Sequence, residues 1–246
     1  MSAAVLRSRV RGPLAFALRL ANPLAPPEAA ETFRQFRTAC LATVIPVVLV
    51  SSVIGATATL MGYHAFLALG TQAMIGAYAG LVALRELAPL LAGAMIAAKP
   101  GTALTAAIAA MRGSEQIDAL EMMGVDPYRY LLGPRVVALI LAAPALLVFA
   151  DVSALAASYG TAVITLEVAP GTFLADLTRF VGVREIWCGL AKAVTFAALS
   201  GMIAAYQGFK AESGPRGVSA AVTRGMVIST MAIVVANFLL SEAFFR

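Results

Sequence analysis

Charged residues are scarce in this chain of 246 residues, since Asp, Glu, Lys and Arg together make up only 13% of it. A soluble domain carries about 25% charged residues, whereas 61% of this chain is hydrophobic. The deficit argues against an ordinary soluble domain and predicts that lipid covers most of the surface. The net charge of +5 does not indicate a nucleic-acid partner, because the Lys and Arg residues flank apolar segments, where they set membrane topology and contact anionic headgroups.

Histidine and cysteine, which are common metal ligands, are nearly absent. The only histidine, His64, has no Cys or His close to it in the sequence, so we expect an ordinary loop residue and no metal site. The two cysteines, Cys40 and Cys188, lie at the edges of apolar segments that we predict to end on opposite sides of the membrane. This placement argues against a disulfide within one chain and favours two small core residues.

Motifs of several enzyme classes are missing as well. The chain has no Gly-x-x-x-x-Gly-Lys-Ser/Thr, the loop with which many ATPases bind phosphate. It also has no His-Glu-x-x-His, no Gly-x-Ser-x-Gly and no paired intramembrane Asp motif. We therefore expect no catalytic residues and no cofactor in this chain, and any ATP and Mg would be bound by a separate subunit.

Five apolar blocks are long enough to cross a hydrocarbon core of about 30 Å as helices. Backbone groups in lipid must form hydrogen bonds internally, so the predicted fold class is an all-α membrane protein with five transmembrane helices. The blocks are residues 39–61, 72–98, 136–164, 186–206 and 225–245, and a weaker Ala- and Thr-rich stretch, 101–111, continues the second. Residues 62–71, 165–185 and 207–224 are expected to be loops.

Basic residues in the loops predict the orientation of the chain in the membrane. Residues 1–38 hold six Arg, whereas the 62–71 loop holds no Lys or Arg. Residues 112–135 and 207–224 hold three Lys or Arg each, against two in 165–185. By the positive-inside rule the N-terminus is cytoplasmic and the C-terminus lies outside.

The N-terminal segment, residues 1–38, resembles no cleavable signal sequence, because its Arg residues are followed by prolines rather than by a clean apolar stretch. Its last part, residues 28–40, places Phe33, Phe36 and Cys40 on one helical face. This amphipathic pattern is typical of a helix lying in the cytoplasmic membrane interface. The alternative is a simple cytoplasmic extension of the first span.

The cytoplasmic loop between spans two and three carries a short helix of its own, over about residues 114–124. Ser114 is a suitable N-cap, and Gly124 followed by Asp126-Pro127 predicts the C-terminal stop and a turn. A helix of this length is not stable alone in water. A helix on the membrane surface would carry Lys and Arg, whereas this one is acidic, so a protein partner is favoured over packing on lipid or on the chain's own spans.

The same loop carries a family resemblance. Residues 111–127 read MRGSEQIDALEMMGVDP, preceded by RELAP at 85–89 and KPGTA at 99–103 and followed by Pro134-Arg135 and by GPRGV at 214–218 with Thr223-Arg224. Together these motifs resemble the MlaE/YrbE family of ABC transporter permeases over roughly residues 30–245.

The resemblance implies a permease domain over residues 39–246, with an N-terminal interfacial helix, five transmembrane helices and a coupling helix at 114–124. It implies a dimer, a cytoplasmic ABC ATPase that receives the coupling helix, a periplasmic MCE-domain protein and a phospholipid-class substrate in a bacterial inner membrane. The residues expected to contact the ATPase are Ser114, Glu115, Gln116, Asp118, Leu120, Glu121, Met123, Gly124 and Asp126.

Four positions depart from the family pattern. Lys99 stands where Arg is usual, Ala107 where Glu is usual, and Asn237 where Asp is common, while Pro100 is unusual inside its motif. These changes leave the coupling motif intact and indicate a divergent subgroup, with a different lipid or a paralogous partner.

Ionisable side chains inside the spans are the candidates for a lipid cavity, because a charge at mid-bilayer costs about 2.5–3.5 kcal/mol on insertion scales. They are Arg85, Glu86, Asp151 and Lys192. Arg85 and Glu86 are about 100° apart on a helix and need separate partners. Glu86 and Lys192 either line a lipid cavity, with Arg85 near a phosphate or carboxylate, or form a structural pair that holds the helices together.

Two other functions compete with an ABC permease. A secondary transporter or channel commonly shows internal repeats, but five spans do not divide into two halves and no repeat is evident. An intramembrane enzyme would need one of the catalytic motifs that the chain lacks.

Overall fold

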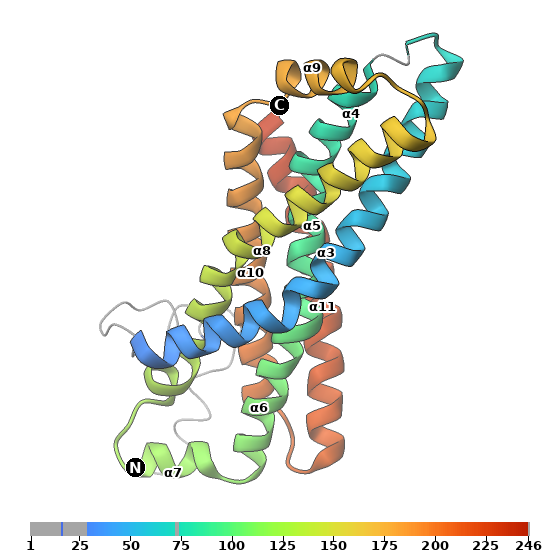
Figure 1. Ribbon diagram of the computed structural model, residues 1–246. Helices are drawn as coiled ribbons and strands as arrows, with labels where there is room; N and C mark the ends of the chain where they lie inside the picture. Colours follow the sequence, from blue (N-terminus) through green and yellow to red (C-terminus); the bar gives the residue numbers. More distant parts are fainter. Residues whose placement is uncertain (1–15, 17–28, 72–73, 246) are drawn as a thin grey trace.

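The computed structural model describes residues 16, 29–71 and 74–245 (Figure 1). These residues form helices and short connections without strands, as predicted for an all-α membrane protein, and five helical segments are long and apolar enough to span a membrane. The spans are Ala29–Ala68, Ile75–Gly113, Tyr128–Thr165, Val183–Phe209 and Pro215–Phe244, and each corresponds to one predicted block. Apart from residue 16 and residues 29–38, the predicted N-terminal segment lies outside the described residues.

The first span is one continuous helix, α3 (Ala29–Ala68), of 40 residues. At 1.5 Å per residue it is about 60 Å long, twice the hydrocarbon core. Its first turns run at a shallow angle and the remainder climbs along the bundle (Figure 1). The described part of the predicted interfacial segment, residues 29–40, is therefore not a separate helix, although this inclined part of α3 occupies its place.

The predicted loop at 62–71 is wrong over most of its length, because α3 continues to Ala68. The turn comes only at Gly70, which has a φ of +68°, a conformation that favours glycine. The extra turns are apolar, with Phe66 packing edge to face on Tyr78 at 5.6 Å between ring centroids. The helix therefore extends until a residue able to reverse the chain is reached.

The second span is a stack of short helical segments that includes the weaker stretch predicted to continue it. α4 (Ile75–Val82), α5 (Ala88–Ile96) and α6 (Thr102–Gly113) are separated by two π-helical segments, η2 (Ala83–Leu87) and η3 (Ala97–Gly101). π segments widen a helix locally and often occur at functional positions. Here η2 holds Arg85 and Glu86, and η3 holds Lys99 and Pro100.

A short helix, α7 (Gln116–Met122), joins the second and third spans. The third span consists of η4 (Tyr128–Leu132), α8 (Gly133–Gly160) and η5 (Thr161–Thr165). The last two spans are α10 (Val183–Phe209) and α11 (Pro215–Phe245), so only residues 210–214 remain of the loop predicted at 207–224.

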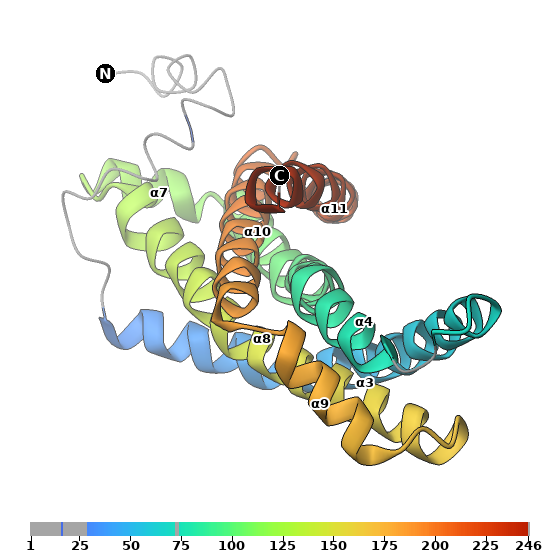
Figure 2. The same ribbon diagram turned by 90° about the horizontal axis from the view of Figure 1, so that it is seen from above.

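The loop predicted at 165–185 contains an additional helix, α9 (Pro170–Phe180), with Pro170 in its first turn. Its Phe173 is fully buried and packs edge to face on Tyr159 at 5.6 Å between ring centroids. Helix α9 lies at the end of the bundle opposite α7 (Figure 1) and packs beside α4 (Figure 2). Pro170 and the apolar spacing of Phe173 and Leu177 were the available signals for this helix.

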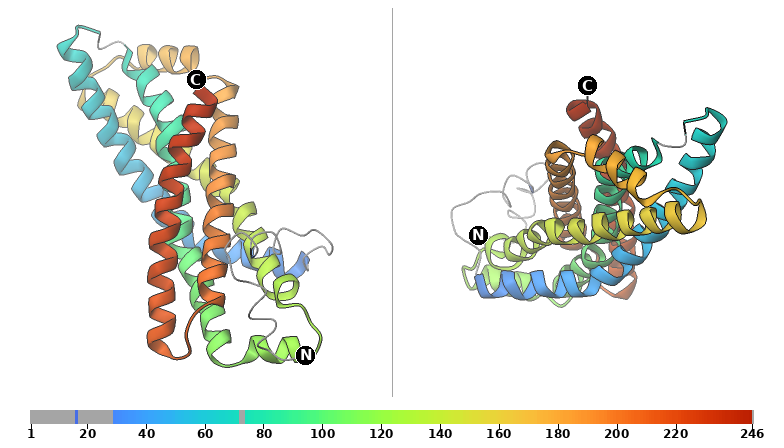
Figure 3. Two further views of the ribbon diagram at one scale, coloured as in Figure 1. Left: turned by 180° about the vertical axis from the view of Figure 1, so that it is seen from behind. Right: turned by 45° about the horizontal axis from the view of Figure 1, so that its top comes forward.

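Small residues bring the spans into close contact. Helix α3 crosses α8 at Gly55, where an added Cβ would lie 2.6 Å from the Ala154 carbonyl oxygen, and the Ser158 hydroxyl donates to the Gly55 carbonyl at 3.1 Å. Helix α10 packs against α8, α6 and α11, while α11 occupies an outer side of the bundle (Figure 3). The core is rich in alanine, which suits close helix packing in a membrane.

Candidate functional site

Three of the four predicted intramembrane charges lie in one polar cluster. The Lys192 ammonium, fully buried on α10, donates to Glu86 Oε1 at 2.8 Å and to the Ser241 hydroxyl at 2.7 Å. The Asn237 amide donates to the other Glu86 oxygen at 2.8 Å. Glu86 is thus held by α10 and α11 together, and its side chain remains 37% exposed.

The backbone of the second span provides a further ligand for Lys192. Its ammonium also donates to the Arg85 carbonyl oxygen at 2.7 Å. In an α-helix that oxygen would accept from the N–H four residues later, which is Pro89 and has none. The proline therefore leaves a carbonyl open, and the lysine occupies it.

Arg85 and Glu86 have different partners, as predicted. Arg85 Nη2 lies 2.7 Å from Glu185 Oε1, and the second Glu185 oxygen accepts from the Gly182 backbone N–H at 2.9 Å. Glu185 thus caps the start of α10 and holds Arg85 at the same time. The sequence does not predict Glu185 as a site residue, because the apolar block of the fourth span begins one residue later, at Ile186.

Beside this cluster is an open pocket of about 470 Å³ between the second span and α11. Its lining residues are Leu81, Val82, Arg85, Glu86, Phe238, Ser241 and Glu242. Charged and apolar side chains therefore share one cavity, which suits an amphiphilic ligand. Lys192 does not line it, since it lies behind Glu86. Asn237 and Ser241, four residues apart on α11, were not predicted as site residues, although polar residues at this spacing in an apolar helix were a usable signal.

Asp151 is not part of the cluster. It lies on α8, and its Oδ1 is buried without a hydrogen-bond partner among the described residues. The α8 positions around it pack on α3, where Ser52 donates to the Ser153 carbonyl at 3.5 Å. The structure therefore separates Asp151 from the other three charged candidates.

The short helix predicted at 114–124 is present as α7, but it begins differently. Ser114 ends α6 instead of capping α7, because its hydroxyl donates to the Ala110 carbonyl at 2.9 Å. Glu115 precedes α7 in a left-handed conformation, with φ of +61°. At the other end Gly124 has φ of +77° and Asp126 Oδ1 accepts from the Tyr128 N–H at 3.0 Å, so the predicted stop and turn are confirmed.

Helix α7 is anchored on one side and open on the other. Ile117 is fully buried in the main core, and Arg112 bonds Asp118 at 2.5 Å. Met122 and Met123 are 84% and 68% exposed. Apolar side chains this exposed beyond the spans are typical of a contact surface. Met122 is not among the residues predicted to contact the ATPase, although its neighbour Met123 is.

The remaining predicted coupling residues lie around this exposed edge. Glu115, Gln116, Gly124 and Asp126 are exposed, whereas Leu120 and Glu121 are half-buried. Desolvation raises the pKa of Glu121, and the negative charges of Asp118 and Asp126 raise it further, against an opposing effect of Arg112. The edge is therefore acidic and partly apolar.

Five apolar spans, a polar cluster beside an open cavity and a short connecting helix with an exposed edge are the features of an integral membrane protein. The chain matches the family model described as Permease MlaE over residues 32–243. It is 33% identical over 192 residues to a protein of Rickettsia felis named "Probable ABC transporter permease protein", covering 78% of this chain and 74% of that protein. The chain belongs to the MlaE family and is an ABC transporter permease.

Two further relatives are similar to most of this chain. A "Probable ABC transporter permease protein" of Synechocystis is 32% identical over 196 residues, which cover 78% of this chain and 73% of the relative. Protein TRIGALACTOSYLDIACYLGLYCEROL 1, chloroplastic, of Arabidopsis thaliana is 30% identical over 198 residues, which cover 80% of this chain and 57% of that protein.

Proposed function

We propose that this chain is the membrane subunit of a lipid-transporting ABC system in a bacterial inner membrane. Its N-terminus is cytoplasmic and its C-terminus periplasmic. Two copies, identical or paralogous, form the lipid pathway, a separate ATPase binds ATP and Mg, and a periplasmic MCE-domain protein receives or delivers the lipid. The observation that carries the proposal is α7, a short helix fixed by its own chain on one side, with two exposed methionines and several acids on the other.

The cavity beside Glu86 supports a lipid as the transported molecule. It combines Arg85 and Glu86 with Leu81, Val82 and Phe238, so it offers polar contacts for a headgroup and apolar contacts for a chain. The Arabidopsis relative is named for trigalactosyldiacylglycerol, which is a glycerolipid. We propose Arg85 and Glu86 as residues in contact with the lipid, and Lys192 as the group that fixes Glu86.

Helix α7 gives a direct test of the ATPase partner. The variant Glu115→Lys with Glu121→Lys reverses two charges on its acidic edge. The matched control is Glu167→Lys with Asp176→Lys, which makes the same charge change at the opposite end of the bundle, and Glu167 shares the positive φ of Glu115. Affinity-purified permease from the native host is assayed for a co-purifying ATPase subunit.

We expect the α7 variant to lose the ATPase and the control to retain it, with both variants still folded. Equal retention by both variants would place the docking surface elsewhere. If the unaltered chain brings down no ATPase, a secondary transporter or channel becomes the better explanation of the lipid cavity. Transfer of fluorescent phospholipid in proteoliposomes, with and without ATP, separates these two functions.

A further inference from the structure

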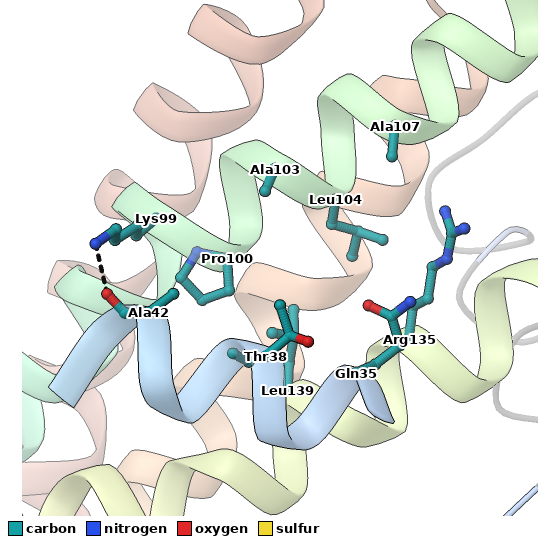
Figure 4. A pocket seen from close by; sticks show the side chains of 11 residues that line it. Gln35, Thr38, Ala42, Lys99, Pro100, Ala103, Leu104, Ala107, Arg135 and Leu139 are labelled. Atoms are coloured by element: carbon teal, nitrogen blue, oxygen red, sulfur yellow. Dashed lines mark hydrogen bonds between the residues drawn. The ribbon is translucent and has the colours of Figure 1, made fainter. Parts of the chain in front are cut away.

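A second pocket lies far from Glu86, between the inclined start of α3, the η3–α6 segment and the start of α8. It has a volume of about 390 Å³, within the range of ligand sites. Figure 4 shows Lys99 and Arg135 towards opposite ends of it, with Pro100, Ala103 and Ala107 along the wall between them. Lys99 and Ala107 are eight residues apart, so this wall is about 12 Å long.

The charges of the lining residues all have one sign. Lys99 and Arg135 are cationic, and none of the other nine residues that line the pocket is acidic. The nearby acid Glu31 is bonded by Arg34 at 2.8 Å and by Gln35 at 2.7 Å. The site therefore favours an anion.

Lys99, like Lys192, donates to a backbone carbonyl that a proline leaves without its usual N–H partner. Its ammonium donates to the Ala42 carbonyl at 2.5 Å. Four residues later stands Pro46, which has no N–H to bond that carbonyl. An ammonium has three donors, and the Ala42 bond uses one.

The rest of the lining is mainly apolar, with Ala39, Ala42, Pro100, Ala103, Leu104 and Leu139 among its residues. A free phosphate would leave this wall without a partner. An acyl chain would cover it, and an anionic headgroup at Arg135 would satisfy the cations.

We propose that this pocket binds one anionic glycerophospholipid. Arg135 binds the phosphate, Lys99 donates to the ester oxygens, and one acyl chain lies against Ala103, Leu104 and Leu139. The site is separate from the Glu86 cavity, so it can be tested whether or not the chain transports lipid. The lipid would fix the inclined part of α3 against α6, next to the span that leads into α7.

The test is native mass spectrometry of the purified, delipidated protein titrated with dioleoylphosphatidylglycerol or dioleoylphosphatidylcholine. We compare Arg135→Gln, Lys99→Gln and Ala107→Glu, the last of which places a carboxylate in the wall between the two cations. The matched control is Ala110→Glu, an equal change at an exposed α6 position outside the pocket. Thermal unfolding reports whether each variant is folded.

The unaltered protein should bind one phosphatidylglycerol at least about tenfold more tightly than phosphatidylcholine. Both lipids offer the same phosphate to Arg135, but Lys99 and Arg135 would repel the choline cation. Arg135→Gln and Ala107→Glu should remove this preference, and Lys99→Gln should weaken it, while Ala110→Glu keeps it. Equal binding of both lipids by the unaltered protein, or an unchanged preference in folded Arg135→Gln and Ala107→Glu, would overturn the proposal. Displacement of the lipid by millimolar inorganic phosphate would also overturn it, because the apolar wall would then contribute nothing.

Discussion

Lys192 is the residue on which the polar cluster depends. Its ammonium is fully buried and bonds a carboxylate, a hydroxyl and a backbone carbonyl from two other segments. Removing one partner of a buried ion pair costs about 3–5 kcal/mol, because the remaining charge is left uncompensated. Because Glu86 is partly exposed, we expect a cost at the lower end of this range of about 3–5 kcal/mol.

We therefore expect Lys192→Met to lower the free energy of unfolding by about 3 kcal/mol. Thermal or denaturant unfolding in detergent checks this value. The double variant Lys192→Met with Glu86→Met removes both charges and should be more stable than the single one. A single variant as stable as the unaltered protein would show that the pair contributes no stability.

A charge swap between Glu86 and Lys192 gives a second prediction at the scale of single residues. If the two side chains bonded only each other, exchanging both charges would restore the activity and stability that each single change removes. Here a glutamate at 192 would face the Arg85 carbonyl oxygen, which is also an acceptor, so we expect Glu86→Lys with Lys192→Glu to remain inactive and unstable. Phospholipid transfer and unfolding temperature measure this, and full recovery in the double variant would mean that the carbonyl bond is dispensable.

At the scale of helices, Gly55 is a point where α3 and α8 approach each other closely. A Cβ at Gly55 would lie 2.6 Å from the Ala154 carbonyl oxygen, so Gly55→Ala should separate the helices and destabilise the protein by about 1–3 kcal/mol. Gly160→Ala is the control, since a Cβ there meets nothing within 4 Å. Equal unfolding temperatures for the two variants would contradict the close crossing.

Helix α7 yields a prediction about pH. The pKa of Glu121 is raised by desolvation and by Asp118 and Asp126, so the folded protein favours its protonated form. This contribution to stability is present below the unfolded pKa and is lost as the pH rises through the folded pKa. Glu121→Gln should therefore unfold at a slightly higher temperature than the unaltered protein at neutral pH, with the difference vanishing at acidic pH. A difference that does not change with pH would exclude this cause.

The number of spans and the existence of α7 could be predicted from the sequence, because apolar length and turn residues are local signals. The start of α7 could not, because the Ser114 hydroxyl has two backbone options and bonds back to Ala110. Helix α9 was missed because its burial depends on Tyr159 and on the cluster around Ile75, which are distant in sequence. The start of α7 thus depended on a choice between two local hydrogen bonds, and the presence of α9 depended on tertiary contacts.

At the scale of the whole molecule, the sequence predicts that the charged residues inside the spans need partners. It does not predict which residues pair with one another. That pairing depends on which faces of the second, fourth and fifth spans meet. Pro46 and Pro89 are examples, because each leaves a carbonyl without its usual N–H donor. The lysine that bonds that carbonyl lies on another helix, and no sequence pattern connects the two segments. The same packing also leaves one span strongly exposed.

Helix α11 is the most exposed of the five spans, since 11% of the residues in its most apolar window are buried, against 28–44% in the others. It also forms one wall of the cavity beside Glu86. A second copy packed on α11 would cover its apolar face and close that cavity, which is the arrangement expected of a lipid pathway shared by two subunits.

We therefore expect a cysteine at Val235 on α11 to form cross-links between copies. The background is Cys40→Ala with Cys188→Ala, and the control is Val152→Cys on α8, because both valines are similarly exposed, at 59% and 62%. After oxidation in native membranes, non-reducing gels should show a dimer for Val235→Cys and little for the control. Equal cross-linking at both positions would indicate random collision. Cross-linking at the control alone would place the second copy on α8. The cavity beside Glu86 would then be formed by one chain and would open directly to the membrane lipid.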